Sequence, residues 1–297
     1  ILGMRLRQVC NESGLNHYMG IAISAFVATI IAWASTLLPA EWTSTPWHPL
    51  LACALFIVPG VPLINFVDDM LDNYIQVGIV RAVNTLLMVA AMAFGIAFAV
   101  KLCHIENFFP TISMVPHHQY WEYAIAAAIS AMGFSMIFNI QRRLLWVVAI
   151  GGIIAVCTRN FVNLGPSTDN IGLDMGLVIG SFSGAVLVSL IAIKAVHWFH
   201  VPNHVLTIPS VIPMIPGVLM YRMLFGIINI NVQSIDQVTP LMKAIESGVN
   251  SGLVIMCIAL GVAIPNIFGR RFIASSKNKR LAELLKERKA RGKFVEW

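Results

Sequence analysis

Long apolar segments follow one another along almost the whole chain, and they limit the folds that it can adopt. A helix needs about 20 predominantly apolar residues to cross the hydrocarbon core of a bilayer. By this measure the sequence predicts eight membrane-spanning helices, at residues 18–38, 49–66, 77–102, 121–138, 143–162, 172–194, 204–226 and 245–268. Only 11% of the residues are charged, whereas soluble domains carry about 25%. We therefore expect an all-α, polytopic membrane protein.

Two of these apolar segments contain the same Pro-Gly-Val sequence. Pro59-Gly60-Val61 lies in the second predicted span, and Pro216-Gly217-Val218 lies 157 positions later in the seventh. Proline removes a backbone N–H and clashes with the preceding turn, so neither segment is expected to be one continuous helix. Matched broken segments in two halves of a membrane protein are typical of a transport site. Two kinked packing helices would give the same pattern.

The matched breaks belong to a longer internal repeat. Residues 19–26 align with residues 175–182 at an offset of 156, and Gly95 aligns with Gly261 at an offset of 166. Spans one to three therefore correspond to spans six to eight. Spans one and six cross the bilayer in opposite directions, so the sequence predicts inverted five-helix repeats, as in many secondary transporters.

The repeat also predicts how the chain is divided. Residues 1–103 form a partial first repeat of three spans, 104–120 an external linker, 121–269 a second repeat of five spans, and 270–297 a basic cytoplasmic tail. A duplication of five-span units needs two further helices before Ile1, so we expect this chain to be part of a longer protein. An apolar stripe of leucines in the tail predicts a short helix there.

The basic residues predict the orientation of the chain. Ten of the twenty Lys and Arg residues lie at or after Arg270. With both termini in the cytoplasm, sixteen basic residues face the inside and four face the outside, which agrees with the excess of positive charge found in cytoplasmic loops. The same tail accounts for the net charge of +6 without a nucleic-acid partner.

Polar residues close to the two breaks are the candidate site residues. A zwitterionic substrate needs N–H donors for its carboxylate and oxygen acceptors for its ammonium group. Broken-helix N-termini supply the donors, and unwound carbonyls or carboxylates supply the acceptors. The candidate substrate-binding residues are Pro59, Gly60, Asn65, Asp68, Asp69, Asn84, Pro216, Gly217, Tyr221, Arg222 and Asn250.

The two arginines near the outer ends of spans have two interpretations each. Arg222 would either pair with a substrate carboxylate or extend to the outer headgroups. Arg159, near the outer end of the fifth predicted span, has the same two roles open to it. A substrate with two carboxylates would require a second cation beside Arg222, for which Arg81 and Arg159 are the candidates.

The acidic and amide candidates are equally open. Asp68 and Asp69 lie near the inner end of their span, where they would form a solvated helix cap or a proton relay. Asn84 and Asn250 are matched by the repeat, and an amide inside a span either serves the site or bonds a neighbouring helix.

Glycines at every fourth position of the sixth span predict a close helix–helix contact, because small residues let two backbones approach. These glycines are Gly172, Gly176, Gly180 and Gly184.

The sequence contains no motif for catalysis or metal binding. Walker, HExxH and GxGxxG motifs do not occur, and the five cysteines include no CxxC pair. His197, His200 and His204 are interrupted by Pro202, and no neighbouring ligand completes a zinc shell. We therefore predict no enzyme activity, no cofactor and no metal site.

Several of the motifs occur together in one known family. They are Phe26–Thr29, Val58–Asn65 followed by Asp69, Gly133–Asn139 with Arg142-Arg143, and Ile212–Val218 with Tyr221. Through them the chain resembles the threonine/serine exporter family, including its split two-subunit form linked to succinate export. The resemblance implies a fused pair of five-helix modules, here without the first two helices and the hydrophilic cytoplasmic domain that precedes them.

The resemblance implies a secondary transporter of the bacterial cytoplasmic (inner) membrane. It would export threonine/serine-type amino acids or succinate-type dicarboxylates by alternating access. The expected partners are a small-molecule substrate and membrane lipid, and a homo-oligomer is left open. The alternative is a non-transporting membrane scaffold whose basic tail recruits partners.

Overall fold

The apolar segments fold into helices, because a helix satisfies every backbone N–H and C=O without water. A computed structural model describes residues 2–34, 60–103, 119–166, 171–199, 201–228 and 238–290, and these residues contain no strand. Their helices are α1 (Leu2–Glu12), α2 (His17–Ala34), α4 (Gly60–Leu71), α5 (Ile75–Leu102), α6 (Tyr120–Ile137), η2 (Arg142–Leu144), α7 (Leu145–Asn163), α8 (Leu177–Phe199), α9 (Asn203–Val211), η3 (Ile212–Met214), α10 (Gly217–Ile228) and α11 (Val238–Ala290).

Five helical segments of the described chain are long and apolar enough to cross a bilayer. They are His17–Ala34, Ile75–Leu102, Arg142–Asn163, Leu177–Val196 and Leu241–Gly269. The chain is therefore a multi-pass α-helical membrane protein, as predicted. The total of eight spans remains a prediction, and most of the second predicted span lies outside the described residues.

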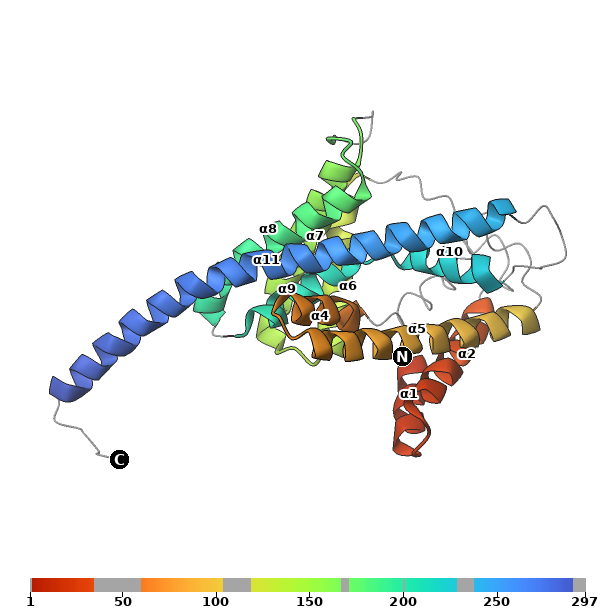
Figure 1. Ribbon diagram of the computed structural model, residues 1–297, viewed down its shortest axis with the longest axis horizontal. Coiled ribbons are helices and arrows are strands. Elements are labelled where there is room, and N and C mark those ends of the chain that lie inside the picture. Colours follow the sequence, from red (N-terminus) through yellow and green to blue (C-terminus); the bar gives the residue numbers. More distant parts are fainter. Residues whose placement is uncertain are drawn as a thin grey trace.

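The helices that correspond in the two repeats make equivalent contacts. In the first repeat α5 packs against α2 and α4, and in the second α11 packs against α8 and α10. Figure 1 shows that α5 and α11 run in opposite directions, since α5 begins on the side toward which α11 ends. Inverted repeats predict this relation between α5 and α11.

Two glycines matched by the repeat allow these equivalent contacts. A Cβ at Gly95 on α5 would collide with the carbonyl oxygen of Ala22 on α2. A Cβ at Gly261 on α11 would lie 2.8 Å from the carbonyl oxygen of Phe182 on α8. Both copies thus bring a long helix against its neighbour at a position that only glycine fits.

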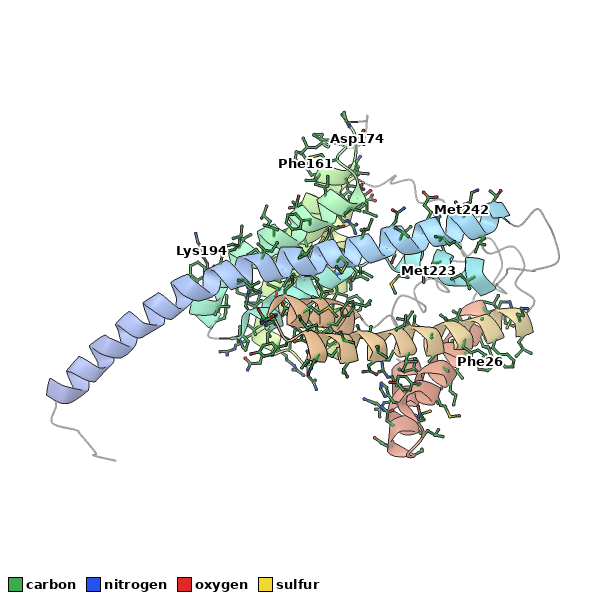
Figure 2. All side chains as sticks on the ribbon, viewed as in Figure 1. Phe26, Phe161, Asp174, Lys194, Met223 and Met242 are labelled. Carbon is green, nitrogen blue, oxygen red and sulfur yellow. The ribbon has the colours of Figure 1, made fainter. Side chains whose placement is uncertain are left out.

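The sixth predicted span begins later than expected. Residues 171–176 run alongside the end of α7, where the Leu173 amide donates to the Phe161 carbonyl over 2.8 Å. Figure 2 shows Phe161 and Asp174 together at that end of the molecule. The first two glycines of the stripe are therefore not helical, because Gly172 precedes α8 and Gly176 takes a φ of +86°. Gly172 still approaches a backbone closely, since an added Cβ would collide with the carbonyl oxygen of Leu164 at the end of α7.

The remaining glycines of that stripe pack as predicted. A Cβ at Gly180 would lie 2.6 Å from the carbonyl oxygen of Arg159, and one at Gly184 would lie 2.5 Å from that of Ala155. Helices α7 and α8 therefore touch along their backbones, which fixes the last turns of α7.

The two ends of the chain differ from the prediction. Residues 2–12 form α1, a helix that the hydropathy pattern did not indicate and that packs against α2. The short tail helix is not separate, because α11 continues without interruption from the last span to Ala290.

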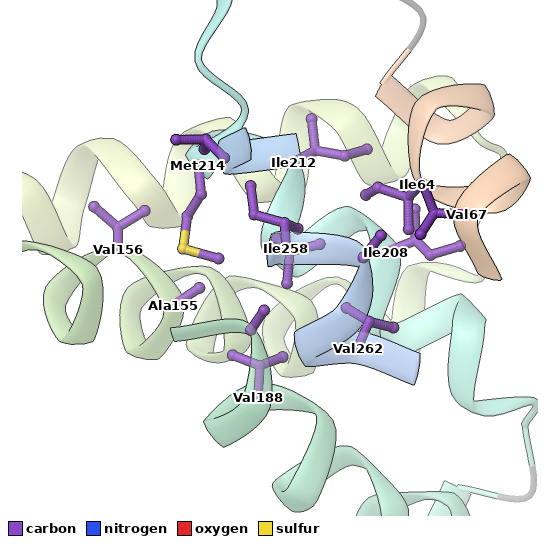
Figure 3. Packing of buried hydrophobic residues seen from close by; sticks show 14 of the residues in the cluster. Ile64, Val67, Ala155, Val156, Val188, Ile208, Ile212, Met214, Ile258 and Val262 are labelled. Carbon is purple, nitrogen blue, oxygen red and sulfur yellow. The ribbon is translucent and has the colours of Figure 1, made fainter. Parts of the chain in front are cut away.

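The largest buried apolar cluster joins the two repeats. It combines side chains from α4 with side chains from α6, α7, α8, α9, η3 and α11. Figure 3 shows Ile64 and Val67 of α4 beside Ile208 of α9, with Ile258 of α11 next to them. The core of the protein thus surrounds the region of the predicted breaks.

Candidate functional site

The break in the seventh predicted span is present, and its prolines explain it. Helix α9 ends at Val211, a 3-10 turn covers Ile212–Met214, and Ile215 is extended with a ψ of 128°. Helix α10 then begins at Gly217. Pro213 and Pro216 each lack the N–H that a continuous helix would need at this point.

The helix that follows the first predicted break starts at the matched position. Helix α4 begins at Gly60, and α10 begins at the matched Gly217. Each of these helices has 12 residues. Pro59 and the rest of the preceding segment lie outside the described residues.

The start of α4 contacts the second break inside the protein. Gly60 is buried, and a Cβ there would lie 2.7 Å from Ile215 Cδ1 and 3.7 Å from Ile212 Cγ1. The N-terminal end of α4 therefore contacts the interrupted segment that leads into α10. Since helix N-termini carry unpaired N–H groups and a partial positive charge, the contact concentrates positive potential at one place.

Further along α4, apolar side chains of the two repeats pack against each other, and we call this packing the apolar seal. Ile64 and Val67 are 1% and 3% exposed, and they share a buried cluster with Ile208 and Ile212. One side of the junction is consequently closed by packed hydrocarbon in this conformation (Figure 3).

Arg159 on α7 reaches the second break. Its Nη1 donates to the Met214 carbonyl over 3.4 Å, and its Nε and Nη2 donate to Asn160 Oδ1 over 3.3 and 3.2 Å. The side chain is partly buried, and Tyr123 of α6 is a polar neighbour. In the described part of the chain no carboxylate lies within ion-pair distance of this guanidinium. Sequence analysis left open whether Arg159 contacts the substrate or extends to the outer headgroups, and it did not predict that this residue reaches the second break.

The aspartates of α4 are paired rather than merely solvated. Asp69 Oδ2 lies 2.5 Å from Arg81 Nη1 of α5, within the first repeat. Asp68 Oδ2 lies 3.8 Å from His204 Nε2 of α9, which belongs to the second repeat. The Asp68–His204 contact thus connects the two repeats beside the apolar seal. Sequence reasoning missed His204 as a partner because 136 residues separate it from Asp68.

The remaining candidates have varied surroundings. Asn84 is exposed, and its Oδ1 accepts a 2.7 Å hydrogen bond from Tyr18 Oη, so it links α5 to α2. Asn250 is exposed on α11, whereas Asn65 and Arg222 are partly buried on α4 and α10.

Two of the predicted positions carry less information. Tyr221 lies on α10, but its side chain is outside the described set. Pro216 immediately precedes α10 and accepts a 3.1 Å hydrogen bond from the Met220 amide. Among the described side chains, no group of three His, Cys, Asp or Glu residues could hold a metal ion.

Two family models match the chain on either side of the segment between its repeats. The model described as "Threonine/Serine exporter, ThrE" matches residues 123–268, and a further threonine/serine exporter model matches residues 1–103. The chain belongs to the threonine/serine exporter family. No solved structure matches it.

Two curated relatives of this exporter-family chain are similar to about a third of its sequence. The probable succinate transporter subunit YjjP of Klebsiella aerogenes is 34% identical over 101 residues, which are 34% of this chain and 39% of the relative. Its counterpart in Escherichia coli K12 is 32% identical over 99 residues, 33% of this chain and 38% of the relative. The chain thus spans well under half the length of these relatives.

Proposed function

We propose that this protein is a secondary transporter that exports small polar metabolites across the bacterial cytoplasmic membrane by alternating access. The substrates would be threonine/serine-type amino acids or succinate-type dicarboxylates. The observation that carries this proposal is the contact between Gly60 and the segment at Ile212 and Ile215. Broken helices from two inverted repeats that meet in the protein interior are the architecture of many transporter binding sites.

The proposed binding site lies between the two helix breaks. Gly60 and Gly217 provide helix N-termini, and the unwound carbonyls around Met214 provide acceptors. We assign Pro59, Asn65, Pro216, Tyr221 and Arg222 to the surroundings of this site, since they flank the same breaks.

The proposed cycle opens and closes the two sides of the junction in turn. With both termini in the cytoplasm, the apolar seal around Ile64 and Val67 lies on the cytoplasmic side, together with Asp68 and His204. Substrate enters when α4 separates from α9, and rocking of one repeat against the other then opens the opposite side. The repeats are joined by an external linker at 104–120 in this scheme.

Uptake into proteoliposomes tests the proposal. The full-length protein would be reconstituted with internal unlabelled substrate, and entry of labelled threonine, serine and succinate would be measured against protein-free liposomes. Saturable counterflow of at least one of them is expected. If none of the three shows it, the membrane-scaffold alternative would stand.

A further inference from the structure

Arg159 is a cation in a membrane-spanning helix, and the two helix breaks do not explain why a charge lies there. An ionisable side chain within the membrane is costly, and such residues usually face a functional cavity or a partner. The backbone contact between α7 and Gly180 holds this residue in place, and its guanidinium reaches Met214. The packing of α7 against α8 therefore fixes the position of the charge.

The hydrogen bonds of Arg159 leave part of the guanidinium available. An arginine has five N–H donors in a planar fork. The described bonds use one donor on Nε, one on Nη1 and one on Nη2, and both acceptors, Met214 O and Asn160 Oδ1, are neutral. One N–H on each terminal nitrogen remains. A carboxylate binds arginine through such a pair of donors.

The surroundings of Arg159 also favour an anion. Met214 adjoins Ile215, against which Gly60 packs at the start of α4, and α10 begins two residues later at Gly217. The guanidinium thus binds the segment that lies between the start of α4 and the start of α10. A cation near a helix N-terminus is electrostatically unfavourable by itself, whereas an anion between them stabilises both. The described side chains supply no carboxylate to Arg159 for this purpose.

We propose that Arg159 binds the carboxylate of the exported substrate at the junction of the α4 and α10 N-termini. This inference rests on the proposed transport function and deepens it, because it names the group on the substrate that is recognised. For an amino acid, the ammonium group would take the Met214 and Asn160 oxygens. For a dicarboxylate, one carboxylate occupies this position.

The experiment compares substrates with and without the carboxylate. Counterflow by the full-length protein would be measured for L-threonine and for L-threoninol, in which a CH₂OH group replaces the carboxylate, and for succinate and succinamide. The variants are Arg159→Gln and Arg159→Met. The control is Lys194→Gln, which removes an exposed cation from α8 (Figure 2).

The wild type is expected to prefer the carboxylate-bearing substrate. Loss of a charge-assisted bidentate contact should raise its KM about tenfold to a hundredfold in both Arg159 variants. The preference over the neutral analogue should disappear at the same time. Lys194→Gln should retain the wild-type KM and the wild-type preference.

Two outcomes would overturn the inference while leaving transport intact. One is an Arg159→Gln variant with wild-type KM and preference, and the other is a wild-type protein that carries the neutral analogue equally well. The second comparison needs no variant, so it decides the matter even if both substitutions prevent folding. Absence of saturable counterflow in the wild type contradicts the proposed function itself, and the inference with it.

Discussion

At the scale of single residues, the contact between the breaks depends on Gly60 having no side chain. The nearest atom to an added Cβ is the terminal methyl of Ile215, and the next are the branches of Ile212. A small side chain could be accommodated by a rotamer change of Ile215. A β-branched side chain meets both isoleucines, so the start of α4 would have to move away from the second break.

Replacement of Gly60 by valine should therefore destabilise the protein by about 1–3 kcal/mol, as for overpacked cores. Counterflow should fall with it. Thermal unfolding in detergent and counterflow measure the two effects. Gly252→Val is the matched control, because Gly252 lies on α11 with no atom within 4 Å of an added Cβ. An equal loss of stability in both variants would show that backbone propensity, and not the contact, is responsible.

Sequence reasoning could locate the second break, but it could not identify the side chains from other helices that contact it. The position of the α10 start follows from Pro216 and Gly217 through a local rule of backbone chemistry. The contacts of Arg159 with Met214 and of Asp68 with His204 join residues far apart in the chain. They depend on how the helices pack, which hydropathy does not contain. The late start of α8 was missed because apolar neighbours hide the turn at Gly176.

At the scale of helices, α4 is the element whose movement the proposed cycle requires. It packs along α11 and α5, and its side chains reach α9 through the apolar seal and the Asp68–His204 contact. In the proposed cycle, opening the seal moves α4 relative to α9 and α11, while its packing against α5 persists. A link between α4 and α9 should therefore be incompatible with transport.

Cross-linking tests this requirement. In a protein whose five native cysteines have been replaced, cysteines at Asp68 and His204 would be joined by a cleavable bifunctional thiol reagent. Counterflow is expected to stop on cross-linking and to return on reduction. The control pair is Phe26 of α2 and Phe98 of α5, whose ring centroids lie 5.4 Å apart within the first repeat. Undiminished counterflow through the linked Asp68–His204 pair would mean that α4 and α9 do not separate.

At the scale of the whole molecule, the inverted repeats and the basic residues together predict the orientation in the membrane. Helix α11 begins on the side where the sequence places Lys243 and continues through the last span into the basic tail. The tail is expected in the cytoplasm because basic segments are retained there.

Thiol labelling from each side of the membrane checks this orientation. A cysteine at Lys243 should react with an impermeant reagent applied from outside to intact cells. A cysteine at Ser275 should react only after the inner face is exposed, as in inverted vesicles. If the cysteine at Ser275 reacts from outside and the one at Lys243 only after the inner face is exposed, the orientation is opposite to the one predicted. The apolar seal would then lie on the outer side.

The unbroken course of α11 has a mechanical consequence. Its 53 residues correspond to about 80 Å of helix at the usual rise per residue. The part beyond Pro265 alone measures about 37 Å, so a tilt of about 10° in the last span would displace its far end by about 6 Å. In the proposed cycle such a tilt would move the basic end of α11, which is expected in the cytoplasm, between two positions, and a protein bound there would be displaced with it.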